Sequence, residues 1–145
     1  MFAIVAAIVI ALDQLSKHWV VNNMFLEEHI TFNCPYFELF YIQNNGAAYS
    51  ILQGKQTLLI VFTLVVMLGI VAYVIAYRKQ VSGLEKFSLA LILGGGVGNL
   101  IDRVMNGYVV DFINTNLIPV FNVADIAITC GCILFAISIL FVKKK

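Results

Sequence analysis

Charged side chains are scarce in this chain. Only 12% of its 145 residues are Asp, Glu, Lys or Arg, whereas 61% are hydrophobic, and the mean hydropathy is +0.95. A soluble domain is typically about 45–50% apolar and about 25% charged. The shortage of charge therefore excludes an ordinary soluble protein and indicates a membrane protein. At about 20 residues per spanning helix there is room for four or five spans, and we expect a single domain.

Signatures of several other functions are also missing. The formal net charge is only +1 and no Lys/Arg run is interleaved with aromatic residues, so we expect no nucleic-acid partner. The three cysteines, Cys34, Cys130 and Cys132, have no paired-ligand spacing. We interpret Cys130 and Cys132 as small packing residues of an apolar helix. No Ser–His or Cys–His set, metal-ligand cluster or phosphate loop is evident, and no cofactor is expected.

Four apolar runs are long enough to cross a bilayer, and we expect spans at about 2–21, 57–77, 84–105 and 121–142. The first run resembles a secretory signal, but no positively charged segment precedes it and apolar residues resume after Asp13, so we expect it to be retained. Lys and Arg are concentrated in the turn between the second and third spans and at the C-terminus. By the positive-inside rule, both termini are predicted to be cytoplasmic.

Residues 22–56 form the longest polar connection, which this orientation places outside the cell. Residues 37–42 are rich in aromatic and β-branched side chains and predict a strand, which Asn44-Asn45-Gly46 follows with turn residues. A second strand is expected at 48–52. We therefore predict a small sheet at the membrane surface. His29 has no identifiable catalytic partner, and we interpret it as a solvated loop histidine.

Three of the chain's four aspartates lie between residues 94 and 125. Carboxylates at or near hydrocarbon depth are costly unless they face a protein interior or a wet cavity, so their presence requires a reason. The fourth, Asp13, lies four residues before Lys17 on one helical face. An ion pair or interface anchor is the simpler interpretation of these two residues, and support of a neighbouring site is the alternative.

The third predicted span has a small-residue surface followed by a polar face. Gly94, Gly95, Gly96 and Gly98 permit close approach of another helix or of a substrate backbone. Asn99, Asp102, Arg103 and Asn106 follow at spacings that place all four on one side of the helix. We interpret Asp102 and Arg103 as a structural ion pair and hydrogen-bond hub, with direct catalysis as the alternative.

Two further aspartates flank the last connection of the chain. Asp111 has apolar neighbours in GYVVDFI, and desolvation there is expected to raise its pKa. Asp125 follows Asn122 by three residues, so the two are most simply a capping pair, and the helix dipole favours an ionised Asp125. Asp125 follows Asp111 by fourteen positions, and this connection can bring both to one depth. Two carboxylates that share a proton can act as base and acid, which predicts aspartyl peptidase chemistry; which one carries the proton stays open.

At these residues the chain resembles a known family. The segments DQLSK (13–17), NNGAAYS (44–50), GGGVGNLIDR (94–103), GYVVDF (107–112) and FNVADIAIT (121–129) are similar to the successive motifs of the lipoprotein signal peptidases, or signal peptidase II. The resemblance covers nearly the whole chain in the right order. It implies an all-α integral membrane protein with four transmembrane helices, a small extracytoplasmic β-cradle and a short helix on that side.

The resemblance also implies a function. It is that of an aspartic endopeptidase of the bacterial cytoplasmic membrane, which cleaves diacylglyceryl-modified prolipoproteins just before the lipid-bearing cysteine. Asp111 and Asp125 would be the catalytic pair; the supporting and substrate-side residues would be Asp13, Asn44, Gly46, Asn99, Asp102, Arg103 and Asn122. We expect a monomer that needs only its prolipoprotein substrate and membrane lipid. A small proton-coupled transporter and a purely structural partner protein are the alternatives; transport is disfavoured because three of the four aspartates lie toward one surface.

Overall fold

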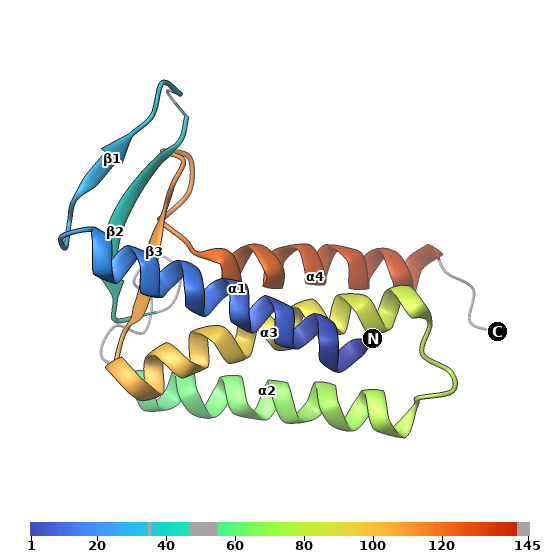
Figure 1. Cartoon of the computed structure of the whole chain (residues 1–145). Coiled ribbons are helices and arrows are strands. Elements are labelled where there is room, and N and C mark those ends of the chain that lie inside the picture. The colour runs from blue at the N-terminus through green and yellow to red at the C-terminus, as the bar shows by residue number, and fades with distance from the viewer. Residues whose placement is uncertain (35, 47–54, 142–145) are drawn as a thin grey trace.

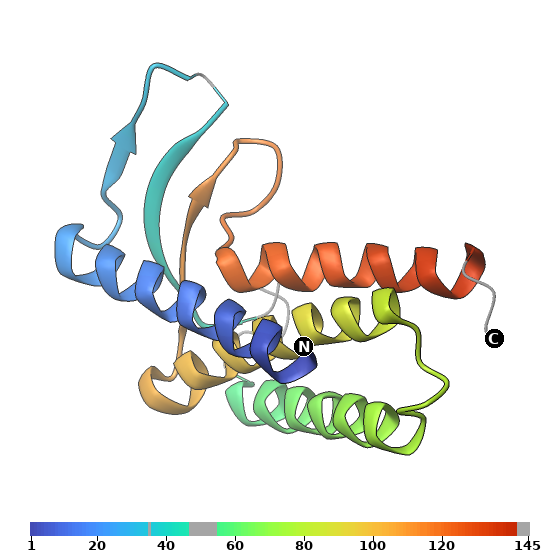
Figure 2. The same ribbon diagram turned by 45° about the vertical axis from the view of Figure 1, so that its right-hand side comes forward.

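Four long helices and a small sheet make up the structure, a computed structural model that describes residues 1–34, 36–46 and 55–141. The helices are α1 (Phe2–Asn23), α2 (Gln56–Ala76), α3 (Gly83–Asn106) and α4 (Val123–Phe141), and the strands are β1 (His29–Thr31), β2 (Glu38–Asn44) and β3 (Val109–Asn114). The helices run side by side, and the sheet projects from one end of the bundle (Figure 1, Figure 2). All four helices are long and apolar enough to cross a membrane. The predicted fold class is thereby confirmed.

Helix α3 is the axis of the bundle, because it packs against each of the other three helices. Its start is fixed by a capping box, in which Ser82 Oγ accepts from the Glu85 N–H at 3.1 Å and Glu85 Oε2 accepts from the Ser82 N–H at 3.4 Å. It ends at Gly107, whose φ of +77° is a left-handed conformation that glycine adopts without strain. By contrast, α2 buries only Leu59 and Met67, since in lipid an apolar helix needs no protein cover.

The glycines of α3 allow this close packing. A Cβ built on Gly94 would lie 2.7 Å from Val9 Cβ of α1, and one on Gly96 would lie 2.6 Å from Met67 Cε of α2. A Cβ on Gly95 would collide with the Ala124 carbonyl oxygen of α4. Successive glycines therefore face three different helices, which confirms the predicted close approach and assigns it to helices.

The sheet is antiparallel with the strand order β1-β2-β3. Its register pairs His29 with Phe40 and Ile42 with Asp111, with an irregularity in β2 between Leu39 and Ile42. One face packs on the end of α1 through a buried cluster of Val20, Met24, Tyr41, Val110 and Phe112. A bridge between Ile113 and Phe121 then returns the chain to the start of α4. Asp111 and Asp125 are thus held on neighbouring segments.

Several local predictions differ from the structure. The predicted strand at 37–42 is present as β2, but β3 was not predicted, and the strand expected at 48–52 lies outside the described residues. His29 is not in a loop: it lies on β1, exposed, with its ring stacked on Phe40 at 3.9 Å between centroids. In the described ranges no helix other than the four long ones is found. Cys130 and Cys132 are exposed on α4 and are not packing residues.

Candidate active site

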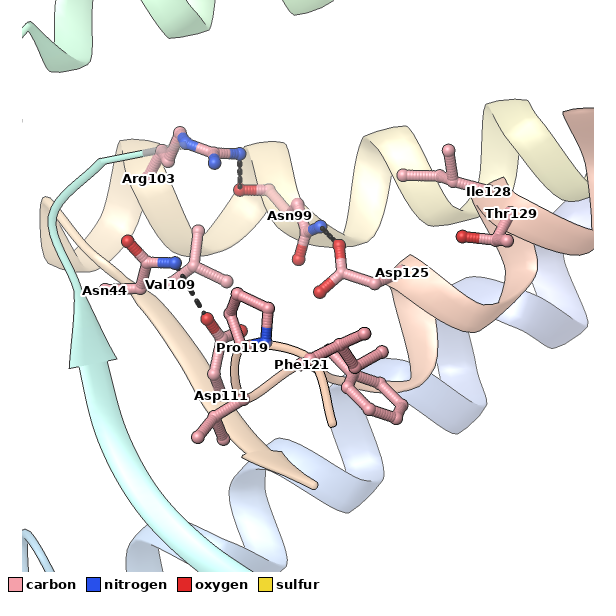
Figure 3. Close-up of a pocket in the computed structure, with 12 residues that line it drawn as sticks. Asn44, Asn99, Arg103, Val109, Asp111, Pro119, Phe121, Asp125, Ile128 and Thr129 are labelled. Carbon is pink, nitrogen blue, oxygen red and sulfur yellow. Dashed lines mark hydrogen bonds between the residues drawn. The ribbon is translucent and has the colours of Figure 1, made fainter. Parts of the chain in front are cut away.

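A cavity of about 380 Å³ opens where β2, β3, α3 and α4 meet. Its polar lining consists of Asn44, Asn99, Arg103, Asp111, Asp125 and Thr129, and its apolar lining consists of Val109, Ile118, Pro119, Val120, Phe121 and Ile128. Both predicted catalytic aspartates therefore line one cavity, and Figure 3 shows their side chains entering it from β3 and from the first turn of α4.

Asp111 is held from two sides by amide groups. Asn44 Nδ2 donates to its Oδ2 at 2.9 Å, and Asn122 Nδ2 donates to its Oδ1 at 2.7 Å. The residue is only 2% exposed. Burial raises the pKa of Asp111 from 3.8 to about 7, and the negative charge of Asp125 raises it too, against the opposing effect of the two amide hydrogen bonds. A carboxyl group with this pKa is about half protonated at neutral pH, so it can donate a proton there.

Asp125 lies in the first turn of α4, as the sequence predicts. Asn99 Nδ2 donates to its Oδ1 at 2.9 Å. The Asn122 N–H donates to its Oδ2 at 3.2 Å, and its own N–H donates to Asn122 Oδ1 at 3.0 Å. The capping interpretation of Asn122 and Asp125 is therefore confirmed. The Asn122 side chain also bonds the Asp111 carboxyl group, and the Asn122 backbone N–H bonds the Asp125 carboxyl group, so this one fully buried residue connects the two.

The wall of the cavity toward β2 is fixed by Gly46 and Arg103. The Gly46 N–H donates to Asn44 Oδ1 at 2.9 Å, which turns the Asn44 amino group toward Asp111. Arg103 Nη2 donates to the Gly46 carbonyl at 3.4 Å, and Nη1 donates to the Asn99 carbonyl at 3.4 Å. Within the described ranges, Arg103 Nε is buried without a hydrogen-bond partner.

Behind the cavity lies a buried charge network between α1 and α3. Lys17 Nζ is 2.8 Å from Asp13 Oδ2 and 2.9 Å from Asp102 Oδ2, so the Asp13–Lys17 pair is confirmed. The predicted Asp102–Arg103 pair is wrong, because neighbouring residues on a helix point in different directions. Asp102 pairs instead with Lys17, so the Asp13–Lys17 pair also has the contacts of its alternative interpretation, support of a neighbouring site. Gln14 Nε2 also donates to Asp102 Oδ1, at 3.0 Å. The polar residues of the segment DQLSK (13–17) in an otherwise apolar helix were the signal in the sequence for Gln14 and Lys17.

The nine predicted site residues are thus brought to one end of the bundle. Five of them line the cavity: Asn44, Asn99, Arg103, Asp111 and Asp125. The other four, Asp13, Gly46, Asp102 and Asn122, bond to the lining residues or to the segments that bear them. In the part of the chain that the structure describes, no cluster of His, Cys, Asp or Glu is suited to hold a metal ion.

Four membrane-spanning helices with two carboxyl groups in one cavity define an integral membrane protein with an acidic site. Residues 5–141 match the family model described as signal peptidase (SPase) II. The chain is 44% identical over 134 residues to the lipoprotein signal peptidase of Halothermothrix orenii, covering 92% of this chain and 91% of the relative. It is 42% identical over 146 residues to the lipoprotein signal peptidase of Brevibacillus brevis, covering 99% and 97%. It belongs to the signal peptidase II family.

Solved structures agree with this assignment. One bacterial membrane enzyme matches with a TM-score of 0.89 and 33% identity, over 96% of this chain and 87% of that one. A second matches with a TM-score of 0.87 and 32% identity, over 98% and 94%. The protein is therefore a multi-pass bacterial membrane peptidase, and the comparisons do not support the transporter alternative.

Proposed function

We propose that this protein is an aspartic endopeptidase that removes the signal peptide from diacylglyceryl-modified prolipoproteins, cleaving just before the lipid-bearing cysteine. It acts as a single domain and as a monomer in the cytoplasmic membrane, with both termini in the cytoplasm. The observation that carries the proposal is that Asp111 and Asp125 line one cavity and are joined through Asn122.

The two aspartates have different surroundings, which suit different roles. Asp111, with a pKa of about 7, holds a proton and donates it to the oxygen of the scissile carbonyl. Asp125 accepts hydrogen bonds from Asn99 and from the Asn122 N–H at the start of α4, where the helix dipole favours negative charge. As the ionised partner it takes a proton from water, which attacks the carbonyl carbon. The proton on Asp125 then passes to the leaving amine as the C–N bond breaks, and Asp111 recovers its proton from a hydroxyl of the tetrahedral intermediate.

The apolar walls of the site suit a substrate that arrives from lipid. A second hollow of about 230 Å³ adjoins the cavity and shares Ile118, Phe121, Asp125 and Thr129 with it. Its remaining walls are Ile126 and Cys130 on the exposed side of α4. The acidic site is therefore continuous with an apolar surface that faces the bilayer, and the acyl chains of a lipidated peptide can stay in lipid while the peptide reaches the carboxyl groups.

The test is cleavage of a diacylglyceryl-modified prolipoprotein by the purified protein in lipid. Asp111→Asn and Asp125→Asn should each lower kcat by at least about 100-fold, because each removes one partner of the acid–base pair. Both variants should still insert into the membrane and unfold near the wild-type temperature. Glu27→Gln is the matched control, since Glu27 is exposed and outside the cavity, and it should cleave normally. Full activity in either aspartate variant would refute the assignment.

A further inference from the structure

We propose that Lys17 is the positioning residue for both candidate catalytic aspartates, acting through Asp13, Asp102 and Asn99. This inference rests on the proposed function. Lys17 lies in α1, is only 3% exposed, and does not line the cavity. Its role therefore has to be transmitted by the groups that it touches.

Each N–H of the Lys17 ammonium group has a hydrogen-bond acceptor within reach. The group has three N–H donors, and three oxygens lie within hydrogen-bond distance: Asp13 Oδ2 at 2.8 Å, Asp102 Oδ2 at 2.9 Å and Asn99 Oδ1 at 2.9 Å. The three acceptors come from two helices, α1 and α3. One buried cation thus fixes the relative position of those helices at the level of the site.

Each carboxylate partner of Lys17 holds a backbone N–H directly before a candidate catalytic residue. Asp13 Oδ1 accepts from the Ala124 N–H at 2.9 Å, and Ala124 precedes Asp125. Asp102 Oδ2 accepts from the Val110 N–H at 3.1 Å, and Val110 precedes Asp111. The start of α4 and the start of β3 are therefore anchored to the same lysine by equivalent contacts.

Lys17 also sets the direction of the hydrogen bonds that reach the carboxyl groups. Because an ammonium group only donates, the Asn99 amide has to turn its oxygen toward Lys17 and its Nδ2 toward Asp125. Asn99 Oδ1 in turn accepts from Asn122 Nδ2 at 3.0 Å, and that amino group also bonds Asp111 Oδ1. Without Lys17, the Asn99 oxygen keeps only the Asn122 amino group as a donor, so the orientation of the Asn99 amide toward Asp125 is held less firmly.

The network needs space that only glycine provides. A Cβ on Gly98 would lie 2.5 Å from Asp13 Oδ2, so a side chain there would displace the carboxylate from Lys17. Gln14 Nε2, which donates to Asp13 Oδ2 at 3.2 Å and to the Gly98 carbonyl at 3.2 Å, occupies the same narrow gap.

Removal of the Lys17 charge has an electrostatic effect that a purely structural residue would not have. The groups that act on Asp111 are Asn44 from β2, Asn122 and Asp125 from the start of α4, Arg103 on the wall of the same cavity, and Lys17 from α1. The positive charge of Lys17 lowers the pKa of Asp111. Its loss raises that pKa further above about 7, so the alkaline limb of the rate profile, where Asp111 loses its proton, moves to higher pH.

The experiment compares Lys17→Met with Lys86→Met in the full-length protein in lipid, with the diacylglyceryl-modified prolipoprotein as substrate. Lys86 makes its hydrogen bond to the Arg78 carbonyl at the other end of α3, so it controls for loss of a lysine. Lys17→Met should lower kcat of the folded protein by about 100-fold, as expected for misplaced reacting groups, with KM changed by less than about threefold. The alkaline limb of the kcat profile should move to higher pH by about half a unit or more. Lys86→Met should match the wild type in kcat, in KM and in the position of the alkaline limb.

A second variant guards against misfolding of Lys17→Met. The double variant Lys17→Met/Asp102→Asn removes one charge of each sign, so the buried network keeps its net charge. It should insert normally and still lose most of kcat, because the Asn99 amide has lost its contact with Lys17. Wild-type kcat in either folded variant, or a loss of kcat in Lys17→Met with no movement of the alkaline limb, would overturn the inference. A wild-type protein that fails to cleave would instead overturn the proposed function on which the inference rests.

Discussion

At the scale of single residues, Asn122 is the side chain on which the site depends. The sequence predicts it as a helix cap, and that role is confirmed by its reciprocal bonds with Asp125. Its bond to Asp111 could not be predicted, because it depends on where β3 runs relative to α4. For the same reason the sequence identified Asp102 as a hub but assigned it the wrong partner. Residue types and helical spacing show which polar groups cannot face lipid. Which groups on different elements contact one another can be known only from the fold.

Asn44 provides a test of the protonation state of Asp111. Asn44→Ala removes a hydrogen bond that lowers the pKa of Asp111, so that pKa should rise above about 7. If Asp111 acts as the acid, activity is lost as pH rises through this pKa, and the alkaline limb of kcat should move up by about one pH unit. Gln43→Ala, at an exposed neighbouring position, should leave the limb in place. A shift to lower pH would contradict the assignment of Asp111 as the acid.

At the scale of elements, the helices were predictable and the sheet was only partly so. Length and apolar character determine a spanning helix, and each helix begins and ends within two residues of a predicted span. Strand β3 is buried at its first four positions, so it has no alternation of polar and apolar residues to reveal it. Its partner β2 lies far away in sequence, on the other side of two helices. Only the strand with a clear aromatic and β-branched composition was found.

The glycine surface of α3 allows a matched test of helix packing. A Cβ at Gly95 meets the backbone oxygen of Ala124, whereas a Cβ at Gly96 meets only the flexible end of Met67. Gly95→Ala should therefore destabilise the protein by about 1–3 kcal/mol and Gly96→Ala by clearly less. Thermal unfolding in detergent measures both. Gly83→Ala, where a Cβ meets nothing within 4 Å, is the control. Equal melting temperatures for the Gly95 and Gly96 variants would contradict the prediction, because they would show that the backbone of α4 moves away from a new Cβ as easily as the end of the Met67 side chain does.

At the scale of the whole molecule, the site and the sheet lie at the same end of the bundle (Figure 1). The sequence predicts this end to be outside the cell, from the distribution of Lys and Arg among the loops. The orientation stays a prediction. If it holds, the carboxyl groups are reached from the outer leaflet.

The native cysteines provide a test of this orientation. Cys34 is exposed between β1 and β2, whereas Cys130 and Cys132 are exposed on a spanning helix and would be shielded by lipid. A membrane-impermeant maleimide applied to intact spheroplasts should therefore modify the protein at Cys34 alone. Cys34→Ser should abolish the labelling, as measured by a mass shift on a gel. Labelling that requires permeabilised membranes would place the sheet in the cytoplasm and reverse the topology.

The contact of 2.8 Å between Lys17 and Asp13 lies within a single helix, one turn apart. Helix α1, which leaves the ribosome before α3, therefore carries its own counter-ion, and it can enter the bilayer with its charge already neutralised, before the segment that contains Asp102 has been synthesised. When α3 packs against α1, Lys17 forms a second ion pair, with Asp102, and keeps the first, with Asp13. The ion pair within α1 is thus available before the rest of the site has been translated.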